Sequence, residues 1–264
     1  IGTRRWMDIL ELLNELRKNP RIPQYHLPDV AAVGKDEKGI LRASVQGASA
    51  YLKIADGCRR PCAFCSIPLI KGTTVSRPLE VILKEAEILQ TRGLKELILI
   101  AQDTTDYGYD LGMKDGLVTL LENLLPRIPE IPWLRLLYSF PGFVSDRLID
   151  LMSDSPQILH YFDIPLQHAD PTILKMMKRP SDIGWVYRTI DKLRKRIPDL
   201  AIRSTFIVGF PGETEKEFVS LLHFLKEMQL DHVGAFTFSF EPGTFSEPLG
   251  DPVSAEEKED RLRR

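Results

Sequence analysis

The segment Cys58-Arg-Arg-Pro-Cys62-Ala-Phe-Cys65 carries all three cysteines of the chain, at the spacing C-x3-C-x2-C. Three thiolates on one short loop can converge on a soft metal centre, and thiolates favour zinc or an iron–sulfur cluster. A structural zinc ion takes four ligands, so a remote histidine, His168 or His232, would have to complete a zinc site. On a cluster of four irons, three cysteines instead leave one iron open for a further ligand. A third interpretation is that the thiols are buried and bind no metal.

Outward from this loop, short β-rich runs alternate with helical patterns, which is typical of βα units and a parallel sheet. Six runs are predicted to be strands: residues 50–55, 96–101, 133–138, 161–164, 201–208 and 232–238. Pro78 and Gly93 mark the two ends of the helix that we expect after the first strand. Thr214 and Glu217 form a capping box at the start of the helix after the fifth strand.

Polar and glycine-rich segments follow these strands directly. They are Asp56-Gly-Cys58, Gln102-Asp-Thr-Thr105, Ser139-Phe-Pro-Gly142, Gln167-His168, Gly209-Phe-Pro-Gly-Glu213 and Glu241-Pro-Gly-Thr244. Six strands that deliver such loops to one end favour a barrel over a doubly wound sheet. Because there are six units and not eight, we predict an α/β fold of the open, partial TIM-type (βα)6 class.

The composition excludes several classes of protein. The chain has 264 residues, 43% hydrophobic and 27% charged, with a formal net charge of -2, which is typical of globular proteins and argues against a broad nucleic-acid surface. Its apolar runs are far shorter than the roughly 18 residues of a membrane span. Three cysteines within eight positions give no disulfide framework, so we expect a cytoplasmic protein.

The cysteine loop, with Phe64 before its last cysteine and a predicted strand before it, resembles that of the radical S-adenosylmethionine (SAM) superfamily. The resemblance implies a 4Fe–4S cluster on Cys58, Cys62 and Cys65, whose open iron chelates the amino and carboxylate groups of SAM. One electron from the reduced cluster then breaks the sulfonium bond. The products are methionine and a 5′-deoxyadenosyl radical, which abstracts a hydrogen from an unreactive carbon.

Further segments are similar to the methylthiotransferase family of that superfamily, over roughly residues 45–250. They are Tyr51-Leu-Lys-Ile-Ala-Asp-Gly-Cys58, Ile100-Ala-Gln-Asp-Thr-Thr-Asp-Tyr-Gly108, Arg135-Leu-Leu-Tyr138, Asp163-Ile-Pro-Leu-Gln-His168, Met177-Lys-Arg-Pro180 and Thr205-Phe-Ile-Val-Gly-Phe-Pro-Gly-Glu-Thr214. Ala-Gln-Asp-Thr-Thr and Leu-Leu-Tyr favour the branch that modifies a small-subunit ribosomal protein. That branch methylthiolates Cβ of an aspartate in the twelfth protein of the subunit.

Two other functions are open at this stage. The first is a tRNA-adenosine methylthiotransferase, against which the net charge of -2 weighs. The second is a binding module that a metal stabilises and that catalyses nothing. Metal content separates the module from either enzyme, because iron with sulfide supports an enzyme whereas one zinc supports the module.

The family pattern also implies parts on either side of the core. Family members carry an N-terminal domain with three further cysteines for a second 4Fe–4S cluster, and a small C-terminal β-barrel. We therefore assign residues 1–44 to the end of a preceding domain plus a linker, 45–250 to the core, and 251–264 to the start of a connection. The resemblance also implies that two SAM molecules serve methyl transfer and radical formation, and this chain alone is expected to lack full turnover.

Two residues of the fifth strand region are candidates for the cofactor pocket. Arg203 alternates with Thr205 inside the predicted strand, so its charge must face the interior or be paired. It either meets the SAM carboxylate or an acid of the site, or forms a structural ion pair. Gly209 ends the strand, where a missing side chain lets an adenine approach the backbone, or serves a tight turn.

The remaining candidates stand at the ends of other strands or beside the cysteines. Gln102 and Gln167 can each donate and accept hydrogen bonds at a strand's C-terminal end, and the resemblance adds Phe64 to the cofactor pocket. His168 is interpreted as a satisfied loop residue. No catalytic acid or base can be assigned.

Positive charge flanks the cysteine loop at Arg59, Arg60 and Lys71. These residues could receive an electron-donor protein of the flavodoxin or ferredoxin kind. Our preferred interpretation is that they are solvated charges.

Overall fold

The computed structural model describes residues 8–23 and 43–264. Of the segment 1–44 that we assigned to the end of a preceding domain plus a linker, residues 1–7 and 24–42 lie outside the described residues. Helix α1 (Ile9–Lys18) ends at Asn19, directly before Pro20, and a proline cannot continue a helix.

Six parallel strands follow one another in chain order. They are β2 (Ser49–Lys53), β5 (Glu96–Ile100), β6 (Trp133–Leu136), β7 (Tyr161–Asp163), β8 (Ala201–Val208) and β9 (His232–Thr237). β2, β5 and β6 form one parallel run, and β7, β8 and β9 form another. A parallel bridge between Leu134 and Ile158 joins the two runs. A doubly wound sheet requires a point at which the strand order reverses. The order of these strands never reverses, so the predicted partial (βα)6 barrel is confirmed.

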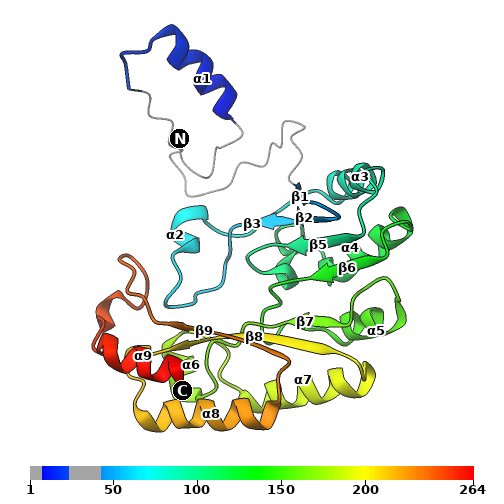
Figure 1. Cartoon of the computed structure of the whole chain (residues 1–264). Helices are drawn as coiled ribbons and strands as arrows, with labels where there is room; N and C mark the ends of the chain where they lie inside the picture. The colour runs from blue at the N-terminus through cyan, green and yellow to red at the C-terminus, as the bar shows by residue number, and fades with distance from the viewer. Residues whose placement is uncertain (1–7, 24–42) are drawn as a thin grey trace.

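Helices cover the outer side of the strands (Figure 1). They are α3 (Leu79–Gln90), α4 (Gly116–Leu124), α5 (Asp146–Asp154), α7 (Ile183–Arg196) and α8 (Glu215–Met228). The predicted capping box is present at α8, where Thr214 and Glu217 bond each other's backbone. α3 begins directly after Pro78. The main apolar core lies between these helices and the strands, and includes Leu52, Leu97 and Leu134.

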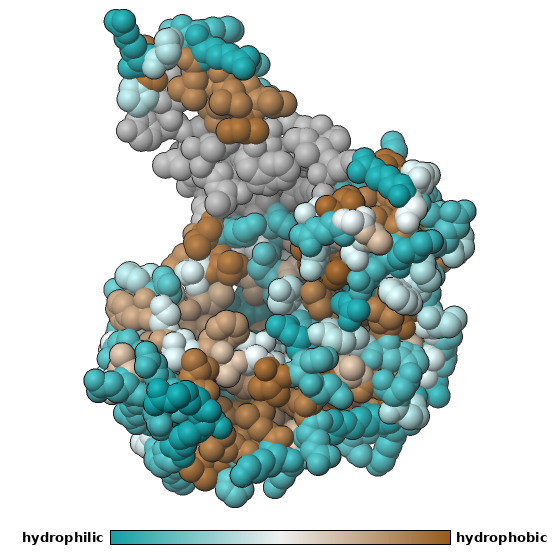
Figure 2. Space-filling view, in the orientation of Figure 1, coloured by the Kyte–Doolittle hydropathy of each residue, from teal (hydrophilic) through white to brown (hydrophobic). Residues whose placement is uncertain are grey.

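The barrel is open at β9. In the described part of the chain, β9 pairs with β8 alone, and the short strand β1 (Ala43–Gln46) adds antiparallel to β2 at the other end of the arc. Val233 and Phe236 of β9 are 48% and 60% exposed. Figure 2 shows apolar side chains on the viewed face over the lower part of the molecule, where β8, β9 and α8 lie.

Smaller elements complete the fold. They are β3 (Ala55–Asp56), α2 (Ile67–Lys71), β4 (Val75–Ser76), α6 (Pro171–Met176), α9 (Ala255–Arg263) and 3₁₀ turns at Thr104–Asp106, Tyr109–Leu111, Leu125–Arg127 and Glu247–Leu249. α9 lies in the segment that we assigned to a connection, yet it packs on the barrel. Its Arg261 is buried and lies 3.1 Å from a carboxylate oxygen of buried Glu213. Among the described helices, none is long and apolar enough to cross a membrane.

Candidate cofactor pocket

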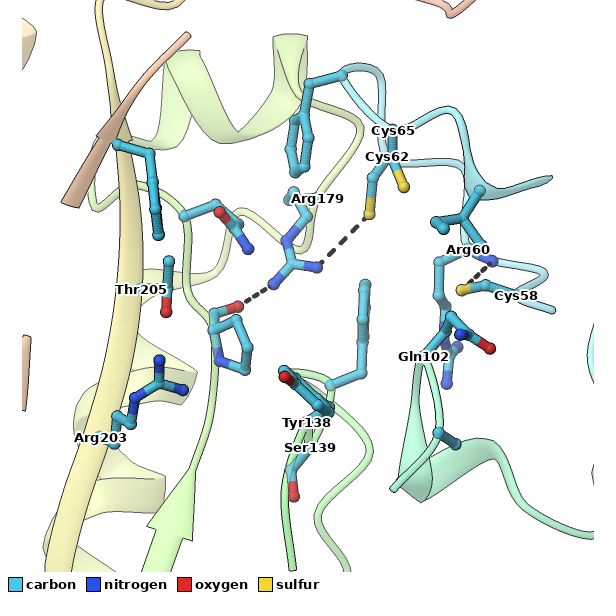
Figure 3. A pocket seen from close by; sticks show the side chains of 17 residues that line it. Cys58, Arg60, Cys62, Cys65, Gln102, Tyr138, Ser139, Arg179, Arg203 and Thr205 are labelled. Carbon is cyan, nitrogen blue, oxygen red and sulfur yellow. Dashed lines mark hydrogen bonds between the residues drawn. The ribbon is translucent and has the colours of Figure 1, made fainter. Parts of the chain in front are cut away.

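A cavity of about 500 Å³ opens among the C-terminal ends of the strands. Its lining combines the three thiols, three arginines and several aromatic rings. The lining residues are Cys58, Arg60, Cys62, Phe64, Cys65, Ile67, Ala101, Gln102, Tyr138, Ser139, Phe140, Pro165, Gln167, Arg179, Arg203, Thr205 and Phe236. Figure 3 shows the cysteine loop on one side of this space and the β8 residues Arg203 and Thr205 on the other.

The cysteine loop is held at its base by a two-strand ribbon. β3 and β4 pair antiparallel on either side of the loop, and the Cys58 N–H donates to the Gly72 carbonyl at 3.0 Å. Gly57 has φ +76°, and a Cβ atom there would lie 2.2 Å from the Thr73 carbonyl oxygen. Only glycine fits this close turn, which directs the cysteines toward the cavity.

The protonation of the thiols depends on their burial and on the charge around them. Burial raises the pKa of Cys58 to about 11, and burial also raises the pKa of Cys65. Both thiols therefore stay protonated at neutral pH unless positive charge is brought against them. Metal ions supply that charge, because they bind the thiolate and displace its proton.

The donor geometry separates zinc from a cluster. Among the described residues, no three His, Cys, Asp or Glu side chains converge in a way that could hold a single metal ion. Neither His168 nor His232 lines the cavity. A four-iron cluster does not need such convergence, since each thiolate binds a different iron. Three thiols around one cavity of this size match the three-cysteine donor set of a cluster, whereas no histidine among the described residues lines the cavity as a fourth ligand for zinc.

Four of the five predicted cofactor residues line the cavity. Phe64 and Gln102 come from the cysteine loop and the end of β5, and Gln167 and Arg203 face them from the other half of the barrel. Gln102 Oε1 is buried and has no hydrogen-bond partner. A buried polar atom without a partner is costly, so a bound ligand with a donor group would fit here.

Arg203 is paired as well as exposed to the cavity. Its Nη1 lies 2.9 Å from Oδ1 of Asp163, which is fully buried, while the Arg203 side chain is 35% exposed. The other carboxylate oxygen of Asp163 accepts the Tyr138 N–H at 2.9 Å. Both sequence interpretations of Arg203 thus have structural support, because one guanidinium forms the ion pair and lines the cavity.

Gly209 lies away from the cavity. Its φ is +73°, and a Cβ atom there would lie 2.4 Å from Lys258 Cγ of α9. The missing side chain therefore makes room for a helix, and the structure gives no support to the adenine contact. His168 is fully buried beside it, with Nδ1 accepting the Asp170 N–H and Nε2 3.5 Å from Glu213 Oε2.

The solvated-charge interpretation of the cations beside the loop is wrong for Arg60. This residue is 7% exposed, its Nε lies 2.6 Å from Asp103 Oδ2, and its guanidinium carbon lies 3.6 Å from the centre of the Phe143 ring. The other two cations are also paired, Arg59 with Asp106 at 2.7 Å and Lys71 with Asp56 at 2.6 Å. Asp103 and Asp106 come from a distant segment, which is why the local sequence did not reveal their pairing with Arg60 and Arg59.

Several lining residues were missed by the sequence reasoning. Tyr138 has a positive φ of 62° and turns the chain at the end of β6, where Ser139 Oγ is buried without a partner. Arg179 is 9% exposed and reaches Cys62. The available signals were the Tyr138-Ser139 position directly after a strand and the segment Met177-Lys-Arg-Pro180, which carried part of the family resemblance.

Comparison with known proteins decides the family. A family model described as the radical SAM superfamily matches residues 52–225. The chain belongs to the radical SAM superfamily. The fold is similar to that of two solved structures: the radical SAM methyltransferase TsrM from Kitasatospora setae (TM-score 0.62, 18% identity, 75% of this chain and 35% of that one) and methylornithine synthase PylB (TM-score 0.58, 14% identity, 82% and 61%).

Sequences that are more similar to this chain than those of the two solved structures are named ribosomal protein uS12 methylthiotransferase RimO. The protein from Chloroflexus aurantiacus is 46% identical over 265 residues, which cover 96% of this chain and 58% of the relative. The protein from Roseiflexus castenholzii is 52% identical over 81% of this chain and 44% of the relative. The chain thus spans about half the length of the curated relatives it matches.

Proposed function

We propose that this chain is the radical SAM core of a transferase that methylthiolates ribosomal protein uS12. The observation that carries the proposal is the convergence of Cys58, Cys62 and Cys65 on one cavity, in a chain 46% identical to a RimO protein along 96% of its length. The three thiols would hold a 4Fe–4S cluster. Gln102 and Arg203 would meet SAM in the same cavity.

When bound, the cluster and SAM supply the electron and the 5′-deoxyadenosyl radical of this chemistry. The chain's own residues would bind and orient these two groups and exclude water from them. Phe64, Phe140 and Phe236 give the cavity an apolar wall, which protects a reactive species from solvent. Asp163 holds the Arg203 guanidinium at the cavity edge through its ion pair, so a carboxylate ligand would meet a cation that is already oriented.

The names of the same relatives support uS12 as the substrate. The acceptor would be Cβ of an aspartate in uS12, and the open side at β9 gives a polypeptide room to approach. Full turnover would also use a second 4Fe–4S cluster, a second SAM, and an electron-donor protein of the flavodoxin or ferredoxin kind. We therefore propose that the reaction takes place in the cytoplasm.

The test is methylthio transfer by the protein expressed from its complete reading frame. Purified uS12 and bulk tRNA are incubated separately with the enzyme, SAM and dithionite under anaerobic conditions, and both acceptors are analysed by mass spectrometry. We expect one methylthio group on a uS12 aspartate and none on tRNA, with the Cys62→Ala variant inactive. Modified adenosine in tRNA would assign the chain to the tRNA branch, and a zinc-loaded, inactive protein would support a binding module.

A further inference from the structure

One charged side chain reaches the cysteines from a remote part of the chain. Arg179 Nη1 donates to Cys62 Sγ at 3.5 Å, across a separation of 117 residues. Figure 3 shows the guanidinium beside the cysteine loop, with a dashed line to Cys62. On its other side, Nη2 donates to the Pro165 carbonyl. Arg179 is 9% exposed and Cys62 is equally buried, so the contact lies where little water screens it.

The other two thiols have different donors. Cys58 Sγ accepts the Arg60 backbone N–H at 3.4 Å, and Cys65 accepts the backbone N–H of Ile67. Both are neutral groups two residues further along the same loop. Among the described residues, Arg179 is thus the charged group that hydrogen-bonds a cysteine sulfur.

The charge of Arg179 is not neutralised by an acid. No carboxylate forms an ion pair with it in the part of the chain that the structure describes, and its guanidinium carbon lies 4.2 Å from the centre of the Phe140 ring. Arg60, the nearby cation on the loop, is by contrast paired with Asp103 and Asp106. The net positive charge beside the three sulfurs therefore comes from Arg179.

The backbone fixes this guanidinium against the cysteine loop. After α6, Lys178 adopts a positive φ of 53°, and the Arg179 N–H returns to the Leu174 carbonyl at 2.8 Å. In the same turn, the Met177 carbonyl accepts the Ala63 N–H at 2.8 Å. Because Ala63 follows Cys62 directly, this main-chain bond ties the position of the guanidinium to that of the sulfur.

Hydrogen bonds to the sulfurs and the net charge around a cluster set its reduction potential. We propose that Arg179 is a positioning residue that makes the cluster easier to reduce, by holding a positive charge and an N–H donor against the Cys62 thiolate. The inference rests on the proposed function, since it needs the cluster. Reduction adds one electron from the reductant to the cluster, and Arg179 keeps its proton throughout. The more negative reduced form gains more from the fixed cation than the oxidised form does.

The experiment measures the reduction potential directly. The anaerobically reconstituted chain is titrated with dithionite, and the reduced cluster is followed by electron paramagnetic resonance, for unaltered protein, Arg179→Gln, Arg179→Lys and Arg188→Gln. Arg188 is a matched control, because its exposed side chain pairs with Asp182 on the surface. In Arg179→Gln we expect the ratio of reduced to oxidised cluster at a given potential to fall about tenfold, a shift of about 59 mV for one electron. In Arg179→Lys we expect the reduction potential to stay close to that of the unaltered protein, and in Arg188→Gln we expect it to be unchanged.

Three results would overturn the inference or its basis, and they are distinguishable. An unchanged potential in Arg179→Gln with a full cluster would show that the guanidinium has no electronic effect. Loss of iron from Arg179→Gln would make the residue a structural support of the loop. Absence of a cluster from the unaltered chain would instead overturn the proposed function itself.

Discussion

Replacement of Cys62 by alanine is expected to remove nearly all iron and sulfide from the reconstituted chain. The chain has three cysteines, and all of them line the cavity, so loss of one leaves two thiolates for a cluster that needs three. Cys62 is the most enclosed of the three and the one that Arg179 contacts. Iron and sulfide assays, with the visible absorption of the cluster, measure the effect.

The matched control for this prediction is Leu69→Ala. Leu69 lies in α2 directly after the cysteine loop and is 51% exposed, so its truncation changes the same region without removing a ligand. We expect this variant to keep its full iron content. A complete cluster in Cys62→Ala would contradict the ligand assignment.

The second large effect is expected at Arg203. Arg203→Met removes the cavity cation that faces the candidate SAM site and leaves the fully buried Asp163 without its partner. A buried carboxylate without its cation is strongly unfavourable, and its negative charge would oppose the carboxylate of SAM. We expect SAM affinity to fall about tenfold or more, which is about 1.4 kcal/mol. Equilibrium binding of radiolabelled SAM to the reconstituted chain measures it.

Arg135→Met is the control for Arg203. Arg135 is likewise a strand arginine in an ion pair, with its Nε 2.7 Å from Glu96 Oε1, but it does not line the cavity. Iron content should be unchanged in both variants, and SAM affinity should fall only in Arg203→Met. If affinity is the same in both, Arg203 serves Asp163 and not the ligand.

The barrel could be predicted from the sequence because the residues that end each strand are recognisable in the sequence itself. The six predicted strands agree with the structure to within about two residues, since β-rich runs stop at glycine, proline or a polar side chain. Strand β1 was missed because it is a four-residue edge strand, Ala-Ser-Val-Gln, without an apolar run. The packing of α9 was missed because its buried residues, Lys258 and Arg261, are charged.

In the candidate site, too, residues with a local sequence signal could be predicted and residues placed by long-range contacts could not. The three cysteines were predictable because their spacing is local, and Gln102, Gln167 and Arg203 because they stand in or after strands that end at one rim. Arg179 could not be assigned, since its contact with Cys62 bridges 117 residues and depends on the turn after α6. At Gly209 the tight-turn interpretation agrees with the φ of +73°, whereas its contact with α9 could not be foreseen because that helix lies at the far end of the sequence.

The most direct test of the central claim is the fate of SAM on the reconstituted chain. The protein is loaded with iron and sulfide under anaerobic conditions, its metals are counted, and it is incubated with SAM and dithionite before chromatography of the products. We expect one 4Fe–4S cluster for each chain, with 5′-deoxyadenosine and methionine formed in equal amounts. One zinc ion in place of the cluster, or intact SAM after incubation with a fully loaded and reduced chain, would contradict the assignment of this cavity to radical SAM chemistry.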